Sequence, residues 1–257
     1  MADEVVLERP GQHVALLRIN RPDAKNALNA EVRRLLAESL ERLGAEPETR
    51  AVVLTGNEEA FAAGADIKDM AEAGAIELMA RNNHLLWRAI AQCPKPIIAA
   101  VNGYAWGGGC ELAMHADIIV AGENASFAQP EVKVGIMPGA GGTQRLMRTV
   151  GKYKAMLMLM TGQPVSGLEA ERMGLASTVV PDSEVLDKAI TIATAIARMP
   201  PLAIAQIKEV ALAGQDASLE TALMLERKAF HLLFASRDQK EGMRAFMEKR
   251  KPTYEGR

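Results

Sequence analysis

Long apolar runs and frequent cysteines are both missing from this sequence of 257 residues. Apolar stretches such as residues 97–101 are far too short to cross a bilayer, which argues against a membrane-spanning protein. The chain holds two cysteines, Cys93 and Cys110, and no apolar leader-like segment near its start. Both features are typical of a reducing compartment. We therefore expect a cytoplasmic protein with free thiols and no membrane partner.

A strong charge of either sign is also absent. The formal net charge is -2, and the one short basic cluster is Lys249-Arg250-Lys251. Nucleic-acid-binding domains usually carry basic patches or stripes. We therefore expect no nucleic-acid partner, and the basic cluster needs another explanation.

Several common catalytic motifs do not occur. The sequence contains no G-x-G-x-x-G, no G-x-x-x-x-G-K-[ST], no G-x-S-x-G and no H-E-x-x-H. The usual signatures of nucleotide binding, serine hydrolysis and zinc proteolysis are thus missing. The histidines, at positions 13, 84, 115 and 231, are not spaced as metal ligands from one site. We expect no metal site.

What is present is an alternation of strand and helix patterns. Residues 14–19, 51–55 and 97–101 read as buried strands, and residues 117–121 read as another. Apolar residues recur at helical spacing between Asn29, a candidate N-cap, and Gly44, a candidate stop. A second helical pattern covers residues 72–92, and the pattern beyond residue 182 is almost wholly helical. The sequence predicts an α/β core over residues 1–198 and a helical region over residues 199–257.

Two glutamates stand in turns marked by glycine or proline. Glu111 ends the segment Gly107-Gly108-Gly109-Cys110-Glu111, and Glu131 ends Gln129-Pro130-Glu131. Glycine allows a backbone N–H to approach a ligand closely, and a glutamate can donate or accept a proton. Together they suit acid/base chemistry on a carbonyl compound. Each feature alone has a structural reading: a tight turn for the glycines and a favourable helix-dipole charge for Glu111.

Three segments, residues 61–68, 102–113 and 129–146, resemble the crotonase superfamily. They include Ala63-Gly64-Ala65-Asp66, the glycine triplet with Glu111, and Pro138-Gly139-Ala140-Gly141-Gly142, in the order typical of that superfamily. The resemblance runs from Asn20-Arg21-Pro22 to Gly256-Arg257 and is strongest for enoyl-CoA hydratases. It extends to bacterial short-chain and 2,3-dehydroadipyl-CoA hydratases of β-oxidation or aromatic-acid catabolism. It implies a spiral of ββα units with a helical C-terminal trimerisation region.

The resemblance also implies roles for the residues of the site. The amides of Ala65 and Gly108 would form an oxyanion hole for an acyl-CoA thioester. Glu111 would activate water for attack on the β-carbon of the enoyl chain, and Glu131 would protonate its α-carbon. Gly139 would help to hold the water, and no metal or redox cofactor would be needed.

Contacts to coenzyme A and to the substrate are implied for a wider set of residues. Phe246 and Lys249 would complete the CoA site of a neighbouring subunit, which would explain the basic cluster; an ordinary charged helix end explains it equally well. The remaining positions are Lys25, Ala27, Leu28, Ala63, Asp66, Ile67, Lys68 and Trp106. Lys68 also fits a solvated surface lysine, and Trp106 also fits ordinary core packing. Members of the family commonly form homotrimers or homohexamers built from two trimers.

Two other functions remain open at this stage. An enoyl-CoA isomerase, or another crotonase-fold acyl-CoA enzyme, would use the same oxyanion hole. A noncatalytic CoA-thioester or RNA-binding protein is a second alternative. The stretch from Met70 to Trp87 would set acyl-chain length, and Arg81 or Arg88 would be the first candidates to bind a dicarboxylic substrate.

Overall fold

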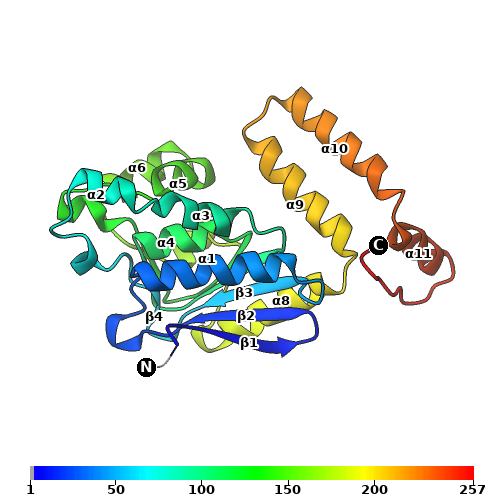
Figure 1. Ribbon diagram of the computed structural model, residues 1–257, viewed down its shortest axis with the longest axis horizontal. Helices are drawn as coiled ribbons and strands as arrows, with labels where there is room; N and C mark the ends of the chain where they lie inside the picture. Colours follow the sequence, from blue (N-terminus) through cyan, green and yellow to red (C-terminus); the bar gives the residue numbers. More distant parts are fainter. Residues whose placement is uncertain (1–2) are drawn as a thin grey trace.

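Two sheets form the framework of the protein in the computed structural model, which describes residues 3–257 (Figure 1). In order across the larger sheet the strands are β1 (Val5–Gly11), β2 (Val14–Ile19), β3 (Ala51–Thr55), β5 (Ile97–Val101), β7 (Ile118–Gly122) and β10 (Thr178–Val180). The smaller sheet has the order β4 (Ala60–Ala62), β6 (Tyr104–Trp106), β8 (Ser126–Ala128) and β9 (Val165–Ser166). The strands predicted at residues 14–19, 51–55, 97–101 and 117–121 are all present, the last beginning at Ile118.

The chain visits the two sheets in a repeating order. A strand of the larger sheet is followed by a strand of the smaller sheet and then by a helix, so that β3–β4, β5–β6 and β7–β8 are successive turns of a spiral. Within each sheet these strands pair in parallel, which requires a crossover after each turn. The predicted spiral of ββα units is thus confirmed.

Helices supply the crossovers and the connections around the sheets. The α-helices of the core are α1 (Ala30–Ala45), α2 (Ala75–Ala80), α3 (Asn83–Ala91), α4 (Gly108–His115), α5 (Gly142–Val150), α6 (Lys152–Thr161), α7 (Gly167–Arg172) and α8 (Val185–Ala197). The short 3-10 segments are η1 (Pro22–Ala24), η2 (Ile67–Asp69), η3 (Pro130–Val134) and η4 (Asp182–Glu184).

The strands of the larger sheet are buried on both faces. Along β3, Val52 and Leu54 belong to the core on the side of α1 and α4, whereas Ala51 and Val53 belong to the core beneath α8. Successive side chains of a strand point to opposite faces, so both sets must be apolar. This is why the sequence reads here as a continuous apolar run rather than an alternating one.

The helix predicted from 72 to 92 is wrong as a single element. The segment contains two helices, α2 and α3, which are separated at Asn82. Asn82 has φ 49°, in the left-handed region, and asparagine enters this region more readily than most residues. By contrast, Asn29 caps α1 as predicted, because its Oδ1 accepts the amide of Val32 at 2.7 Å.

The C-terminal helices α9 (Pro201–Gln215), α10 (Leu219–Leu233) and α11 (Arg237–Met247) extend away from the sheets (Figure 1). The predicted helical C-terminal region is therefore present. A bend of 109° separates α8 from α9, at the site of the Pro200-Pro201 pair. In residues 3–257, no single helix combines the length and apolar character needed to cross a bilayer. The division into units at 198/199 falls at this bend and stays a prediction.

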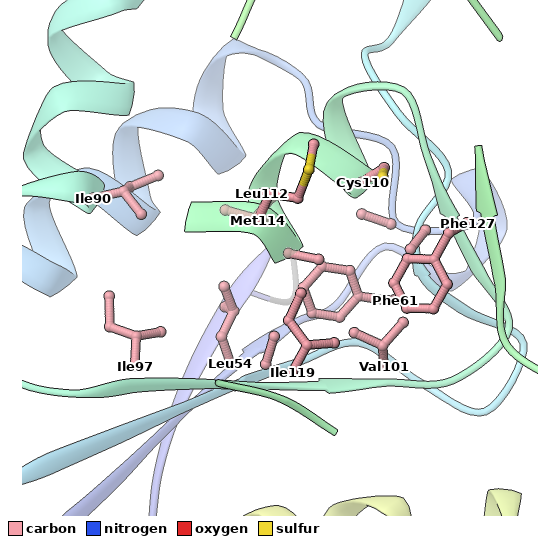
Figure 2. Packing of buried hydrophobic residues seen from close by; sticks show 14 of the residues in the cluster. Leu54, Phe61, Ile90, Ile97, Val101, Cys110, Leu112, Met114, Ile119 and Phe127 are labelled. Atoms are coloured by element: carbon pink, nitrogen blue, oxygen red, sulfur yellow. The ribbon is translucent and has the colours of Figure 1, made fainter. Parts of the chain in front are cut away.

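Every residue of helix α4 is buried, and the helix packs against β4 and β6 of the smaller sheet. Figure 2 shows Leu112 and Met114 of this helix above Leu54 and Ile119 of the larger sheet, with Phe61 of β4 between them. Burying one such side chain contributes about 1.5–3 kcal/mol. The packing holds the first turn of α4 against the end of the smaller sheet, where the candidate site lies.

Candidate active site

Glu111 is a buried carboxylate in the first turn of α4. Its Oε1 accepts the backbone amides of Ala140 and Gly142, each at 2.7 Å. Ala140 lies in the loop that leads into α5, and Gly142 is the first residue of that helix, about thirty positions further along the chain. The loop therefore holds the carboxylate in one place and orientation.

Opposing effects act on the acidity of Glu111. Burial raises its pKa, while the amides of Gly142 and Ala140 and the charge of Arg145 favour the ionised form and limit that rise. Hydrogen bonds to a carboxylate stabilise its charge. The surroundings of Glu111 thus include the donors that an ionised base needs.

Glu131 comes from the other side of the site, in η3 just after β8. Its Oε1 lies 3.0 Å from the point where a Cβ on Gly107 would stand, so it sits directly beside the turn that begins α4. Burial raises the pKa of Glu131 to about 7, and the nearby charge of Glu111 contributes to the rise. The structure therefore brings the two predicted acids together and leaves them with different surroundings.

The predicted oxyanion amides also meet here. A Cβ built on Gly108 would stand 3.4 Å from the backbone nitrogen of Ala65. Among residues 3–257, neither the amide of Ala65 nor that of Gly108 donates to any acceptor. Gly108 opens α4, where amides have no partner within the helix, so its N–H is available to a ligand.

Glycine is required next to this amide for a steric reason. A Cβ on Gly109 would stand 1.9 Å from the carbonyl oxygen of Ala62 in β4. The glycine triplet thus does more than ease a turn, because it lets the start of α4 lie directly against the smaller sheet.

A strained loop supports the Ala65 side of the site. Lys25 and Asn26 both have positive φ, at 48° and 57°. Asn26 is fully buried, and its side chain accepts the amide of Arg21 and donates to the carbonyl of Ala60. Leu28 then pairs with Ala65 as in a parallel sheet, with its amide donating to Gly64 at 2.7 Å. A strained backbone of this kind persists only where surrounding contacts hold it in place, and here the hydrogen bonds of Asn26 and Leu28 do so.

The other residues predicted to bind CoA or substrate divide into two groups. Lys25, Ala27, Leu28, Ala63, Asp66, Ile67 and Lys68 all lie on the paired loops beside Ala65. Within this group Ile67 and Lys68 are exposed, whereas the Asp66 carboxylate faces Arg21 at 3.4 Å and accepts the amide of Lys68. Trp106 ends β6, and its indole donates to Ser126 at 2.9 Å.

The second group lies outside the site of its own chain. Phe246 and Lys249 stand at the end of α11, on the part of the molecule that extends away from α4 (Figure 1). Phe246 is 85% exposed. Their predicted role at a CoA site therefore requires a second copy of the chain.

Sequence reasoning missed two kinds of contact. The amides that reach Glu111 are those of Ala140 and Gly142, which the sequence did not single out, while the water-holding role of the neighbouring Gly139 stays a prediction. Gln129 is fully buried. When its side-chain amide is turned so that the oxygen and the nitrogen both find suitable partners, the nitrogen donates to both oxygens of Glu131, at 3.2 and 3.3 Å. The sequence feature that could have indicated this contact is the position of Gln129, a polar residue between the apolar residues of a strand and Pro130.

Behind Glu111 lies a third unexpected contact. The ring nitrogen Nδ1 of His115 is 2.8 Å from the carbonyl oxygen of Glu111, and the ring packs on Trp87 with centroids 5.2 Å apart. Burial, together with the charge of Arg145, lowers the pKa of His115 to about 4. His115 is therefore a neutral core residue rather than a surface one.

A family comparison agrees with this geometry. The model of the enoyl-CoA hydratase/isomerase family matches residues 9–257. The chain belongs to this family. Its curated relatives include a probable enoyl-CoA hydratase of Mycobacterium tuberculosis, 44% identical over 254 residues, with 99% of each chain covered. They also include the 2,3-dehydroadipyl-CoA hydratase of Escherichia coli, again 44% identical over 254 residues with 99% of each chain covered.

Solved structures of the family share the whole fold. An enoyl-CoA hydratase subunit from Geobacillus kaustophilus superposes with a TM-score of 0.95 at 42% identity, covering 99% of this chain and 98% of that one. The enoyl-CoA hydratase of Bacillus anthracis also gives 0.95, at 37% identity, covering 99% of this chain and 100% of that one. The family's fold thus accounts for the spiral core and the C-terminal helices together.

Proposed function

We propose that this protein is an enoyl-CoA hydratase, which adds water reversibly across the double bond of a trans-2-enoyl-CoA to give a 3-hydroxyacyl-CoA. The observation that carries the proposal is the convergence of two carboxyl groups and two unengaged amides on one spot at the start of α4. Relatives that are 44–47% identical over nearly the full chain and are named as enoyl-CoA hydratases or probable enoyl-CoA hydratases support it.

Each group has one task in this reaction. The amides of Ala65 and Gly108 donate to the thioester oxygen, where negative charge develops when water attacks. Ionised Glu111 takes a proton from the water while the water oxygen bonds to the β-carbon. Protonated Glu131 gives its proton to the α-carbon. A proton then passes from Glu111 to Glu131 and restores both groups.

The acidities of the two glutamates support this division of roles. Glu131, with a pKa of about 7, keeps a proton near neutral pH, as a general acid must. Glu111 has two amide donors and the field of Arg145, all of which favour its charged form. Two carboxyl groups in unlike surroundings are a common basis for acid/base assignment. The reaction consumes only water and the thioester, so we propose that it needs no cofactor.

A product assay with crotonyl-CoA tests the proposal. The wild-type protein should form 3-hydroxybutyryl-CoA, and Glu131→Gln should reduce the rate about 10²–10⁴-fold without loss of fold or CoA binding. A variant that kept nearly the full rate would refute the assigned mechanism. Conversion of a 3-enoyl-CoA to a 2-enoyl-CoA without uptake of water, and without a 3-hydroxyacyl product, would instead identify an isomerase.

We further propose that the enzyme works as a homotrimer or as a hexamer of two trimers. Helices α9 and α10 bury none of their residues within the described chain. Large apolar side chains are exposed along them, among them Ile207, Leu223, Phe230 and Leu232. Exposed apolar surface of this kind marks protein interfaces. A second copy would cover these faces and could supply Phe246 and Lys249; mass measurement in solution tests the assembly.

A further inference from the structure

The last residues of the chain, 250–257, fold back along α11 and are called the strap. Arg250 forms a bidentate ion pair with Glu241, in which Nη1 and Nη2 lie 2.6 and 2.9 Å from the two carboxylate oxygens. The amide of Thr253 donates to the same carboxylate at 3.1 Å. Glu241 therefore turns the chain back onto the helix that it has just left.

The far end of the strap is held by Asp238, a carboxylate at the start of α11 that is 2% exposed. Its two oxygens accept the amides of Glu255 and Gly256, at 2.8 and 2.9 Å. In return, the carbonyl oxygen of Arg257 accepts the amides of Arg237 at 2.6 Å and Asp238 at 3.3 Å. A buried charge needs such donors, and its hydrogen bonds are stronger than neutral ones. Asp238 is thus the residue that fastens the strap to the helix.

The turn between α11 and the strap is strained. Lys249 has φ 55°, in the left-handed region that glycine usually fills after the end of a helix. Its amide donates to the carbonyl of Phe246 at 3.2 Å, and the amide of Arg250 donates to that of Ala245 at 3.0 Å. A residue with a Cβ keeps this conformation only where the surrounding structure fixes it. The strap fixes it here, so the conformation at Lys249 depends on the strap.

The strap also contacts the core. Arg50, which precedes β3, donates from Nη2 to the carbonyl of Tyr254 at 2.9 Å and from Nη1 to the carbonyl of Ala197 at 3.4 Å. A Cβ on Gly256 would stand 3.0 Å from the ring of Pro201. Figure 1 shows the C-terminus beside the start of α9. The strap therefore ties α11 to the bend between α8 and α9, in addition to the chain connection through α10.

The end of α11 carries the two residues predicted to serve the CoA site of a neighbouring copy. Phe246 is 85% exposed, and Lys249 is exposed as well. An aromatic ring and a cation suit the adenine ring and the phosphates of CoA. Binding loses affinity when it must first order a mobile segment. A helix that offers such contacts to another copy therefore gains from being held in place.

We propose that the strap positions α11 to bind the nucleotide part of CoA in a neighbouring copy, and that Asp238 is the positioning residue. This inference rests on the proposed function, in which Phe246 and Lys249 complete that copy's CoA site. Asp238 acts through the strap and does not itself contact CoA. An acid that only favoured the helix dipole would need neither burial nor the two amides of the strap.

Binding of free CoA, measured by calorimetry, tests the proposal without any catalysis. Asp238→Ala should weaken CoA binding about threefold to thirtyfold, because the loosened helix must be ordered on binding. Asp187→Ala is the matched control, since it removes an exposed acid from the first turn of α8, and it should bind CoA as wild type does. Equal affinities for wild type and Asp238→Ala would overturn the proposal.

Kinetics with two thioesters separate positioning from general damage. Asp238→Ala should raise KM for crotonyl-CoA by a similar factor and leave kcat within about twofold of wild type. Crotonyl-pantetheine lacks the nucleotide, so its kcat/KM should also stay within about twofold of wild type. A variant that lost activity towards both thioesters alike would show a purely structural role for Asp238 and would overturn the proposal.

A double variant tests whether Asp238 acts through α11. Phe246→Ala should weaken CoA binding, and adding Asp238→Ala should cause little further loss, because both changes remove the same contact. Fully additive losses, or no loss from Phe246→Ala alone, would contradict the proposal.

Arg50→Met loosens the strap from the side of the core and leaves Asp238 intact, so it serves even if Asp238→Ala fails to fold. It should weaken CoA binding in the same direction, and an unchanged affinity would count against the strap.

Hydrogen exchange locates the effect in the chain. The amides of Glu255 and Gly256 should exchange faster in Asp238→Ala than in wild type, while those of β3 and β5 should not change. Unchanged exchange at Glu255 and Gly256 would show that Asp238 does not hold the strap. A change of mass in solution would show that the strap serves assembly instead, which would overturn its role in CoA binding.

The outcomes separate the two proposals. If the wild-type protein hydrates no thioester but its CoA affinity depends on Asp238, the hydratase function fails and the role of the strap stands. If hydration proceeds and CoA affinity does not depend on Asp238, the role of the strap fails and the hydratase function stands. A wild-type protein that binds no CoA would refute both.

Discussion

Glu111 and Gly142 are joined by a hydrogen bond of 2.7 Å, from the amide that opens α5 to the carboxylate in the first turn of α4. A second amide, from Ala140, reaches the same oxygen at 2.7 Å. The candidate base is therefore held by backbone groups that no side-chain substitution removes. This allows its chemistry to be tested separately from its position.

Glu111→Gln should fold normally and hydrate crotonyl-CoA about 10²–10⁴-fold more slowly. A glutamine oxygen can still accept the amides of Ala140 and Gly142, but the side chain cannot take a proton from water. Single-turnover kinetics and the thermal unfolding midpoint measure the two effects. A rate close to wild type would show that Glu111 is not the base.

The rate of hydration should fall as pH rises through about 7. Glu131 must be protonated to donate to the substrate, and its pKa is raised to about 7. Dehydration starts from the same singly protonated pair, because a proton passes between Glu111 and Glu131, so its rate should fall over the same range. Profiles of kcat/KM in both directions provide the test. A rate of hydration that stayed constant as pH rose through about 7 would contradict the assignment.

Stability should depend on pH through the same group. The folded pKa of about 7 exceeds the ordinary value of 4.5, so between these values the native state holds the proton more tightly than the unfolded chain does. The contribution of Glu131 is therefore complete below pH 4.5 and is lost as pH rises through about 7. Urea unfolding at mildly acidic and mildly alkaline pH should show a smaller difference for Glu131→Gln than for wild type.

Gly108→Ala should fold and lose about 10²–10³ in kcat. The added Cβ would stand 3.4 Å from the nitrogen of Ala65 and 3.8 Å from the carbonyl carbon of Gly64, which are ordinary contacts, so it would occupy the space between the two amides without a steric clash. Gly74→Ala is the control, because a Cβ there meets nothing within 4 Å. An unchanged kcat in Gly108→Ala would remove this glycine from the oxyanion hole.

Lys25→Met should raise KM for the thioester several-fold and weaken its dependence on salt, with little change in kcat. Lys25 lies over the ring of Tyr104 at 4.8 Å and pairs with Glu59 at 3.2 Å, beside the predicted CoA loop. Attraction of an anionic ligand to an exposed lysine is screened by ions. Lys154→Met, which removes a similar surface pair with Glu169, is the matched control. Equal effects of both substitutions would exclude a specific CoA contact.

Local patterns predicted most of the elements because neighbouring residues determine them. The apolar runs at β3 and β5 are buried on both faces, and Asn29 caps α1 through its own side chain. The predicted helix over residues 72–92 failed at a single residue, Asn82, whose backbone is left-handed. Apolar spacing does not report such a break.

The sequence by itself determined which acids and which glycines the candidate site has available, since a carboxyl group and a residue without a Cβ are properties of the chain. Only the tertiary structure decided their acidity and their partners. The raised pKa of Glu131 comes from burial and from a charge twenty positions away, and the donors to Glu111 come from another turn of the spiral. The hydrogen bonds of Asp238 to the amides of Glu255 and Gly256 likewise exist only because the end of the chain folds back along α11. Desolvation and long-range contact depend on the whole fold, which is why neither could be predicted from neighbouring residues.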